Sequence, residues 1–410
     1  MRIKKFIFIS IVFVFVIFYS CCSFASTYEY IWSTIADTTH GNSSIAVSSD
    51  LNSGSLNLES TGAILIEQST GQILYEQNSH EKLRPASVTK VMSILLIMEA
   101  LDRGEITLDT LIPCSENARS MGGSQIWLDT RETLSVNDML KAICVVSAND
   151  CTMAMAEYLA GSEEVFVERM NTRAKELGMN DTHFVNCHGI DEDNHVTSAY
   201  DISLMSRELL TNHPEVTNYT TIYMDSLRDG KSELVNTNKL LRTYNGCSGL
   251  KTGSTGLALY NLSASATRDD LSLIAVVMHA PSTAIRFSEA KKLLDYGFTN
   301  YSCVSFGKTG DVATTAEITK GTSQTVEAVF ESSASVIIKK GLEKSVTQNI
   351  VLDENLEAPI VKGQKIGVAN YTLNNEIIAT VNLVANDDVK KSGFLNITTN
   401  VYSEWFNMMR

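Results

Sequence analysis

The amino-acid sequence predicts a mixed α/β domain, followed by a small all-β domain and a C-terminal amphipathic helix. Three observations support this fold class. A long apolar run with helical spacing occupies residues 84–101, apolar strand patterns occur both before and after it, and only short alternating runs remain after Cys303. At 410 residues the chain is long enough for two domains.

The composition is that of a soluble globular protein, and it limits the classes of partner. Hydrophobic residues make up 44% of the chain and charged residues 20%, and the formal net charge is -14. Such an acidic chain lacks the basic surface that nucleic acids require, so we expect no nucleic-acid partner. An anionic substrate would have to be held by a local cation.

Residues 1–25 have the layout of a secretory signal peptide. A basic start, M-R-I-K-K, precedes an apolar run over residues 6–19, and small residues surround a cleavage site after Ala25. The run is shorter than the roughly 20 residues of a membrane span. An uncleaved anchor and a lipid-modified Cys21 or Cys22 are the alternatives. In each case we expect the folded domains outside the cytoplasm, at the outer face of the cytoplasmic membrane.

The α/β domain is predicted over residues 59–300. Residues 26–58, rich in Ser, Thr, Asn and Asp, predict a loosely ordered lead-in. The domain begins with a hairpin over residues 63–76, which turns at a Ser-Thr-Gly sequence, and the long apolar helix follows and ends at Gly104. A loop over residues 109–125 leads into further helical patterns, which start at Ser135, stop at Gly161, and continue over residues 163–177 and 199–210.

Strands return in the last part of this domain. Residues 219–244 are irregular and polar, which predicts surface structure. Apolar runs between residues 249 and 281 predict a hairpin at the centre of a sheet, and a helix that ends near Phe298 closes the domain.

The C-terminal part of the chain predicts two further units. Residues 301–393 carry short alternating runs separated by turn residues, which predicts a small sandwich-like β domain, with Lys308-Thr309-Gly310 as a turn. Residues 394–410 predict an amphipathic helix that lies on a membrane surface. The alternative is a terminal helix packed on the β domain. The apolar stripe of this helix consists of Phe394, Ile397, Val401, Trp405 and Met408.

Six cysteines follow the signal peptide, and their spacing matches neither a Cys-x-x-Cys motif nor a metal site. Cys144 and Cys151 read as parts of one helix, in which seven residues separate them by about 10.5 Å, too far for a disulfide. We therefore expect the cysteines to be mostly free or buried. The six are Cys114, Cys144, Cys151, Cys187, Cys247 and Cys303.

The start of the apolar helix carries a serine and a lysine that point to nucleophilic catalysis. Pro85 precedes the run, so Ser87 falls in its first turn, and Lys90 lies on the same face three residues later. A serine hydroxyl needs a base, and a lysine is a base only when burial or a neighbouring cation lowers its pKa. The same spacing recurs elsewhere in the chain, but only Ser87 opens a strongly apolar helix.

Two further motifs follow in order. Ser147-Ala148-Asn149 supplies a hydroxyl and an amide near a junction between helices, and Lys251-Thr252-Gly253 supplies a cation at a strand edge, followed by Ser254. Each motif alone is common. Together with Ser87-Val88-Thr89-Lys90, in this order, they match the signature of penicillin-binding enzymes and related serine hydrolases.

The resemblance extends beyond the signature. The segments L-Y-E-Q-N-S-H-E-K-L-R-P-A-S-V-T-K, M-G-G-S-Q-I-W-L, V-V-S-A-N-D, H-G-I-D and G-L-K-T-G-S-T-G are similar to the low-molecular-mass D-alanyl-D-alanine carboxypeptidases, penicillin-binding proteins that trim peptidoglycan. The similarity covers roughly residues 58–298, and the β domain and tail resemble the C-terminal half of the same family. It implies a transpeptidase-like α+β catalytic domain, related to serine β-lactamases, over residues 59–300.

The resemblance also implies a role for each motif. Ser87 would attack the carbonyl between two D-alanines, with Lys90 as the base, and form an acyl-enzyme. Ser147 would relay a proton to the leaving amine, and Asn149 would orient Lys90 and the substrate amide. The backbone amides of Ser87 and Ser254 would form the oxyanion hole. The terminal carboxylate would be held by Lys251, Thr252 and Arg286, and Gly253 and Ser254 would also bind the substrate.

The implied partners are a peptidoglycan stem peptide ending in D-Ala-D-Ala and β-lactam antibiotics, with no metal or organic cofactor. His188 has no evident Asp partner in the sequence, which favours a structural role. Three alternatives use the same signature: a β-lactamase, for which no general-base Glu is evident, a peptidoglycan endopeptidase, and a wall protein that binds penicillin without turnover. The motifs do not specify the third residue of the stem peptide.

Overall fold

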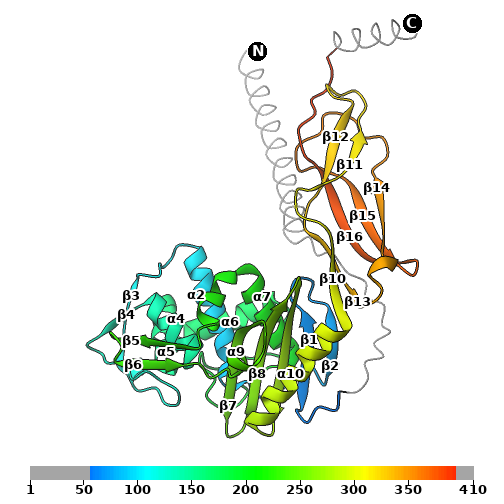
Figure 1. Cartoon of the computed structure of the whole chain (residues 1–410). Coiled ribbons are helices and arrows are strands. Elements are labelled where there is room, and N and C mark those ends of the chain that lie inside the picture. The colour runs from blue at the N-terminus through cyan, green and yellow to red at the C-terminus, as the bar shows by residue number, and fades with distance from the viewer. Residues whose placement is uncertain (1–55, 394–410) are drawn as a thin grey trace, which may run out of the picture.

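The computed structural model describes residues 56–393, which form an α/β domain and an elongated β domain that extends from it (Figure 1). The predicted signal peptide, most of the lead-in and the predicted amphipathic helix lie outside the described residues. Within the described part of the chain, no helix is long and apolar enough to cross a membrane.

A five-stranded antiparallel sheet organises the α/β domain. Its strand order is β2-β1-β9-β8-β7, so β9 is central and β7 lies at an edge. Both predicted hairpins are confirmed, because β1 pairs with β2 and β8 with β9. The strands are β1 (Gly62–Glu67), β2 (Ile73–Gln77), β7 (Cys247–Thr255), β8 (Leu259–Arg268) and β9 (Leu271–Ala280).

Helices cover both faces of this sheet. Side chains alternate between the faces along each strand, so one strand contributes to the core on both sides. Ala63 and Leu65 of β1 belong to the cluster with the closing helix α10 (Thr283–Asn300). Ile64 and Ile66 belong to the larger cluster with the helices of the opposite face. The inner strands β1 and β9 are therefore buried on both sides, which explains their nearly continuous apolar runs.

The helices of the larger cluster match the predicted patterns, with two corrections. Cys144 and Cys151 lie in different helices and not in one, because Ser147 adopts a left-handed conformation (φ +67°) between α4 and α5. The expected loop at 109–125 contains β3 and the short helix α3. The elements are α2 (Lys90–Asp102), β3 (Leu111–Pro113), α3 (Glu116–Arg119), β4 (Thr133–Ser135), α4 (Val136–Val145), α5 (Asn149–Ala160), α6 (Glu163–Glu176) and α7 (Ala199–Asn212).

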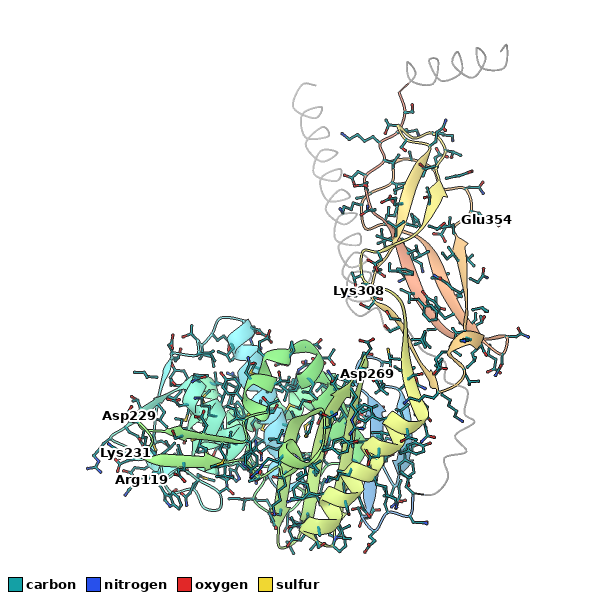
Figure 2. The ribbon with its side chains drawn as sticks, in the orientation of Figure 1. Arg119, Asp229, Lys231, Asp269, Lys308 and Glu354 are labelled. Atoms are coloured by element: carbon teal, nitrogen blue, oxygen red, sulfur yellow. The ribbon has the colours of Figure 1, made fainter. Side chains whose placement is uncertain are left out.

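The segment between α7 and β7 is more regular than predicted. A short hairpin, β5–β6, projects from the helical side of the domain, and its turn carries Asp229 and Lys231 (Figure 2). Short helices precede and follow this hairpin. The elements are α8 (Thr217–Thr220), β5 (Met224–Leu227), β6 (Ser232–Val235) and α9 (Leu240–Thr243), with a 3-10 turn at Pro214–Val216.

The β domain follows α10 directly and confirms the expected all-β character. A two-stranded sheet, β10–β13, shares a core with a five-stranded sheet of order β11-β12-β16-β15-β14. Tyr371 is fully buried and stacks on Phe306 at 4.3 Å between ring centroids. The strands are β10 (Tyr301–Gly307), β11 (Val312–Glu317), β12 (Thr325–Phe330), β13 (Ala334–Lys339), β14 (Thr347–Leu352), β15 (Lys365–Leu373) and β16 (Glu376–Ala385), with a 3-10 turn at Glu343–Ser345.

The second Lys-Thr-Gly sequence forms a turn, as expected. Lys308 lies in the β domain (Figure 2), and Gly310 closes the turn with φ +86°.

The six cysteines of the described residues are free, and four of them are buried. No group of three or more His, Cys, Asp or Glu residues in the described ranges is placed to hold a metal ion.

Candidate active site

The predicted nucleophile lies in a tight turn at the foot of α2. Residues Ala86–Thr89 form a 3-10 turn, and the α-helix itself begins at Lys90, one turn later than the sequence suggested. Side chains three residues apart are eclipsed in a 3-10 turn, which brings Ser87 and Lys90 together. The Lys90 Nζ donates a hydrogen bond to the Ser87 Oγ at 3.1 Å, as predicted.

Lys90 is completely buried and its amine is held at three points. Besides Ser87 Oγ, the Nζ donates to the Asn149 side-chain carbonyl at 2.6 Å and to the His188 backbone carbonyl at 2.7 Å. Burial, with a smaller contribution from the charge of Lys251, holds the pKa of Lys90 well below its usual value. The lowered pKa favours the neutral form of the amine, and a neutral amine can accept the proton of the serine.

Two glycines allow neighbouring segments to approach this turn, and a third allows a loop to approach Asn149. A Cβ atom at Gly253 of β7 would lie 2.8 Å from the Pro85 carbonyl and 2.9 Å from the Ser87 amide nitrogen. One at Gly189 would lie 1.9 Å from the Ala86 carbonyl oxygen, and one at Gly123 would lie 2.8 Å from Asn149. The glycine of the third motif is therefore required because the edge strand runs directly against the nucleophile turn.

The cation of the third motif lies beside the turn on β7. Lys251 is 1% exposed, and its Nζ donates to the Thr252 carbonyl at 3.1 Å, the one partner that the described residues give it. Burial, with a smaller contribution from the charge of Arg286, lowers the pKa of Lys251 to about 7. An anion at this position would restore the charge that burial disfavours. Thr252 shares a hydroxyl hydrogen bond of 2.6 Å with Thr237, and Ser254 is exposed.

Arg286 reaches the same strand from α10. Its Nη1 donates to the Gly253 carbonyl at 3.1 Å and to the Asn261 carbonyl at 3.2 Å, and its guanidinium lies 4.7 Å from the centre of the Phe287 ring. Burial lowers the pKa of Arg286 to about 10. The structure therefore brings Arg286 to the backbone of the third motif, while a contact with a substrate carboxylate stays a prediction.

Ser147 occupies the junction between α4 and α5, as predicted. Its hydroxyl is buried and has no hydrogen-bond partner among the described residues. A buried hydroxyl without a partner costs free energy, of the order of 1 kcal/mol or more, unless a substrate group or water completes it. The adjacent Asn149 is fixed, because its Nδ2 donates to the Gly122 carbonyl at 2.7 Å and its backbone amide to the Ser124 carbonyl at 2.7 Å.

Sequence reasoning missed three contributors. The first is the His188 backbone carbonyl, which accepts a hydrogen bond from Lys90. The His188 ring is turned to another residue, since its Nε2 lies 3.5 Å from the Glu163 Oε1. Burial lowers the pKa of His188 to about 3. The ring is therefore neutral, in agreement with the structural role expected for it. Thr237 supports Thr252, and Asn261 donates to the Arg84 carbonyl at 2.8 Å. Of these three, only His188 could have been found from the sequence, because it belongs to the H-G-I-D segment that resembles the family.

Comparison with known proteins decides the family. The family model described as D-alanyl-D-alanine carboxypeptidase matches residues 48–282, and the model of the C-terminal domain of penicillin-binding protein 5 matches residues 301–391. The chain belongs to the D-alanyl-D-alanine carboxypeptidase family. The expected fold of the catalytic domain and the expectation of a serine-type hydrolase are confirmed at this level.

Members of this family resemble the chain over most of its length. A D-alanyl-D-alanine carboxypeptidase of Bacillus subtilis is 40% identical over 351 residues, which cover 85% of this chain and 90% of the relative. The crystal structure of penicillin-binding protein 5 from Haemophilus influenzae superimposes with a TM-score of 0.73 at 32% identity, covering 82% of this chain and 98% of that one.

A second solved structure contains an antibiotic. Penicillin-binding protein D2 from Listeria monocytogenes, in its ampicillin-bound form, superimposes with a TM-score of 0.55 at 32% identity, covering 59% of this chain and 99% of that one. The match to both family models, one for each domain, favours the carboxypeptidase family over the β-lactamase alternative.

Proposed function

We propose that this protein is a serine D-alanyl-D-alanine carboxypeptidase, which removes the terminal D-Ala from peptidoglycan stem pentapeptides through an acyl-enzyme and is acylated by β-lactam antibiotics. The observation that carries the proposal is the contact between Ser87 and Lys90, at 3.1 Å, with the amine fully buried and its pKa lowered. The family membership supplies the substrate class.

Acylation needs a base and an oxyanion hole. Lys90 takes the proton of Ser87 as the Oγ bonds to the carbonyl carbon between the two D-alanines. The amides of Ser87 and Ser254 bind the developing oxyanion; the close approach of Gly253 to the Ser87 nitrogen supports this pairing. Loss of one such donor typically costs about 10²- to 10³-fold in kcat.

Departure of D-Ala and hydrolysis of the acyl-enzyme complete the proton balance. The carbon–nitrogen bond breaks as the proton passes from Lys90 through Ser147 to the leaving amine. The unpartnered Ser147 hydroxyl and the fixed position of Asn149 support these roles. Water then attacks the ester, Lys90 accepts its proton, and that proton returns to the Ser87 oxygen as the acyl bond breaks.

Selection of a free C-terminus falls to the third motif. A substrate carboxylate would pair with the Lys251 ammonium and hydrogen-bond to the hydroxyl of Thr252, and we assign Arg286 to the same carboxylate. Lys251 supports this role because it is buried and engages only one neighbouring carbonyl in the described residues. A buried charge without an opposite charge gains most from a ligand that supplies one.

The location is part of the same proposal. We place the protein at the outer face of the cytoplasmic membrane, exported by residues 1–25 and held at the membrane surface by residues 394–410. The sequence layout of both segments supports this placement. If removal of the residues after Gly393 left the mature protein associated with lipid vesicles to the same extent, the role of the tail would be wrong.

The decisive experiment is mass spectrometry of the products from a muropeptide monomer that ends in D-Ala-D-Ala and from a cross-linked dimer. The mature protein should release one alanine from the monomer, and Ser87→Ala should release none. Ser288→Ala is the matched control, because Ser288 also precedes a lysine by three residues but is exposed on α10. Cleavage of the dimer alone would replace the proposal by the endopeptidase. Penicillin binding without any product would replace it by the non-turnover alternative.

A further inference from the structure

The surface beside Asn149 carries a tryptophan in an unusual state. Trp127 is 75% exposed and has a positive φ of +54°, although its neighbours Ile126 and Leu128 are 6% and 3% exposed and belong to the domain core. A left-handed conformation is disfavoured for a bulky residue, and exposure of an indole forgoes the gain of burying it. Two such costs at one residue point to a function for the exposed ring.

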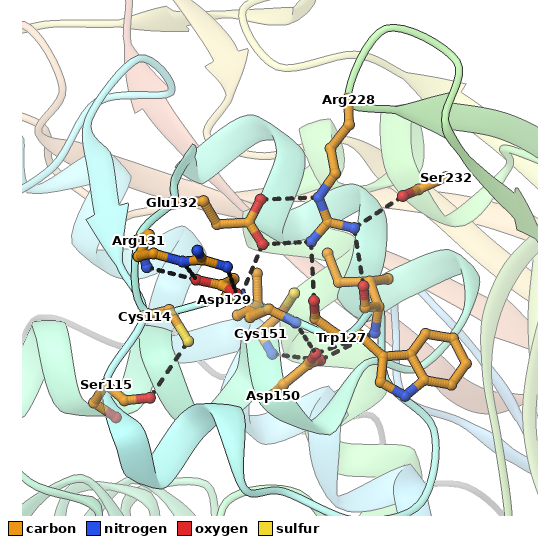
Figure 3. A network of polar contacts seen from close by, with 12 residues as sticks. Cys114, Ser115, Trp127, Asp129, Arg131, Glu132, Asp150, Cys151, Arg228 and Ser232 are labelled. Atoms are coloured by element: carbon orange, nitrogen blue, oxygen red, sulfur yellow. Dashed lines mark hydrogen bonds and ion pairs between the residues drawn. The ribbon is translucent and has the colours of Figure 1, made fainter.

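The loop that presents Trp127 is fixed by a buried polar network (Figure 3). The carboxylate of Asp150, 0% exposed, accepts hydrogen bonds from the amides of Ile126 at 3.1 Å and Leu128 at 3.0 Å, on either side of the tryptophan. The Arg228 Nη1 donates to the Ile126 carbonyl at 2.9 Å. The tryptophan is therefore held in place from both sides of the chain.

Both anchors of this network belong to elements that also form the active site. Asp150 follows Asn149 in α5, so one residue orients Lys90 and the next holds the tryptophan loop. Arg228 is fixed by two hydrogen bonds to Glu132, at 2.6 and 2.9 Å, and it opens the turn of the β5–β6 hairpin. Two residues after β6, Thr237 contacts Thr252 of the third motif.

Chain geometry places the ring within reach of the substrate. The Ser124 carbonyl accepts the Asn149 amide at 2.7 Å, and Trp127 is three residues further along, at most about 10 Å away even for an extended chain. In the proposed reaction the substrate carboxylate lies at Lys251 and the scissile carbonyl at Ser87. Because the resemblance assigns Asn149 to the substrate amide, the preceding part of the peptide would leave the site on the side of Asn149.

We propose that Trp127 is a specificity-determining residue, which binds the side chain of the third residue of the stem peptide and favours a side chain that ends in a free ammonium group. This inference rests on the proposed function. An indole face attracts an ammonium group and packs against the aliphatic chain that carries it. The third residue directly precedes the scissile D-Ala-D-Ala, so a long side chain on it can span the distance to the loop, and the chain's net charge of -14 favours a cationic group.

Peptide selectivity tests this assignment. We would measure kcat/KM for acetyl-L-Lys-D-Ala-D-Ala with a free ε-amine, for its ε-acetylated form, and for acetyl-L-Ala-D-Ala-D-Ala. Trp127→Ala should lower the ratio of the free-amine peptide to the alanine peptide by about 3- to 10-fold, and Trp127→Phe should retain most of it. Leu108→Ala, a matched change at another exposed apolar residue of the domain, should keep the wild-type ratio.

The outcomes separate the two proposals. If wild type cleaves none of the three peptides, the proposed function fails. If it cleaves them and the ratio is the same in Trp127→Ala, only the role of Trp127 is overturned. Equal losses for the free and acetylated lysine peptides would overturn the ammonium contact.

Tryptophan fluorescence gives a second readout that does not depend on turnover. The chain has three tryptophans, and the other two, Trp32 and Trp405, lie outside the described residues. In a Ser87→Ala variant with Phe at those two positions, emission comes from Trp127 alone. It should change on titration with the free-amine lysine peptide more than with the alanine peptide. If the emission responded instead to the peptidoglycan disaccharide without a stem peptide, the ring would be assigned to the glycan and the proposal would be overturned.

Discussion

The two buried lysines of the site share an environment but differ in their partners. Lys90 engages three acceptors, from Ser87, Asn149 and the His188 carbonyl, whereas Lys251 engages one backbone carbonyl in the described residues. Burial lowers the pKa of both. The difference separates two tasks: the amine of Lys90 is fixed against the nucleophile, and the ammonium of Lys251 is left available to an incoming anion.

The surroundings of the two lysines explain how each position is kept. Lys90 opens α2, and the glycine at 189 brings the His188 carbonyl to it by packing against the Ala86 carbonyl. Lys251 lies in an edge strand that pairs with β8 on one side only and faces the nucleophile turn on the other. Lys90, which must accept and return a proton, is therefore held by three acceptors, and Lys251, which must bind a ligand, keeps hydrogen-bonding capacity unused in the described residues.

The largest expected effect comes from Lys90→Arg, which keeps the positive charge but cannot supply a neutral base at any working pH. We expect acylation by a fluorescent penicillin to slow by about 10³-fold, within the range of lost general-base catalysis. Lys291→Arg is the control, because Lys291 follows the exposed Ser288 at the same spacing. A near wild-type acylation rate in Lys90→Arg, with an unchanged thermal midpoint, would show that Lys90 is not the base.

Replacement of Lys251 should change the preference for a C-terminal carboxylate more than the rate of the acylation step. In Lys251→Ala the preference for a peptide ending in D-Ala carboxylate over the same peptide ending in carboxamide should fall by about 10²-fold, the scale of a lost buried ion pair. Lys308→Ala is the matched control, because Lys308 belongs to the second Lys-Thr-Gly sequence in the β domain. An unchanged carboxylate preference in Lys251→Ala would remove Lys251 from the carboxylate site.

The contact at the centre of the site could be predicted from the sequence, because it depends on local spacing. Ser87 and Lys90 are three residues apart after a proline, and any helical turn at that point brings them together. The proximity of Asn149 and Lys251 to this pair was predicted from the order of the motifs, together with the resemblance to the family. The fold class followed from periodicity in the same way, since both hairpins and the closing helix have unbroken patterns.

The parts that could not be predicted depend on the backbone. A junction between helices near Ser147 was predicted, but the left-handed conformation of Ser147 that separates α4 from α5 was not, because such a conformation is uncommon for serine. The contact of His188 with Lys90 uses a backbone carbonyl, which no side-chain pattern reveals. The hydrogen bonds of Arg286 to the carbonyls of Gly253 and Asn261 are backbone contacts of the same kind, and its contact with the substrate carboxylate stays a prediction.

The smallest and most graded effect is the pH dependence, which tests both lysines in one profile. Lys90 acts as a base only when neutral, so kcat/KM should fall as the pH drops through its lowered pKa. Lys251 binds the carboxylate only when charged, and its pKa in the free protein is about 7, so kcat/KM should also fall as the pH rises above this value, by up to tenfold per pH unit. The two limbs should therefore form a bell.

A single substitution separates the limbs. In Lys251→Arg the cation stays charged over the whole range, because a guanidinium has a much higher pKa than an amine, and the alkaline limb should disappear while the acid limb remains. If the alkaline limb survives in Lys251→Arg, the group that titrates there is not Lys251. The comparison between the two lysines would then rest on their hydrogen bonds alone, and a different group would have to be sought for the carboxylate.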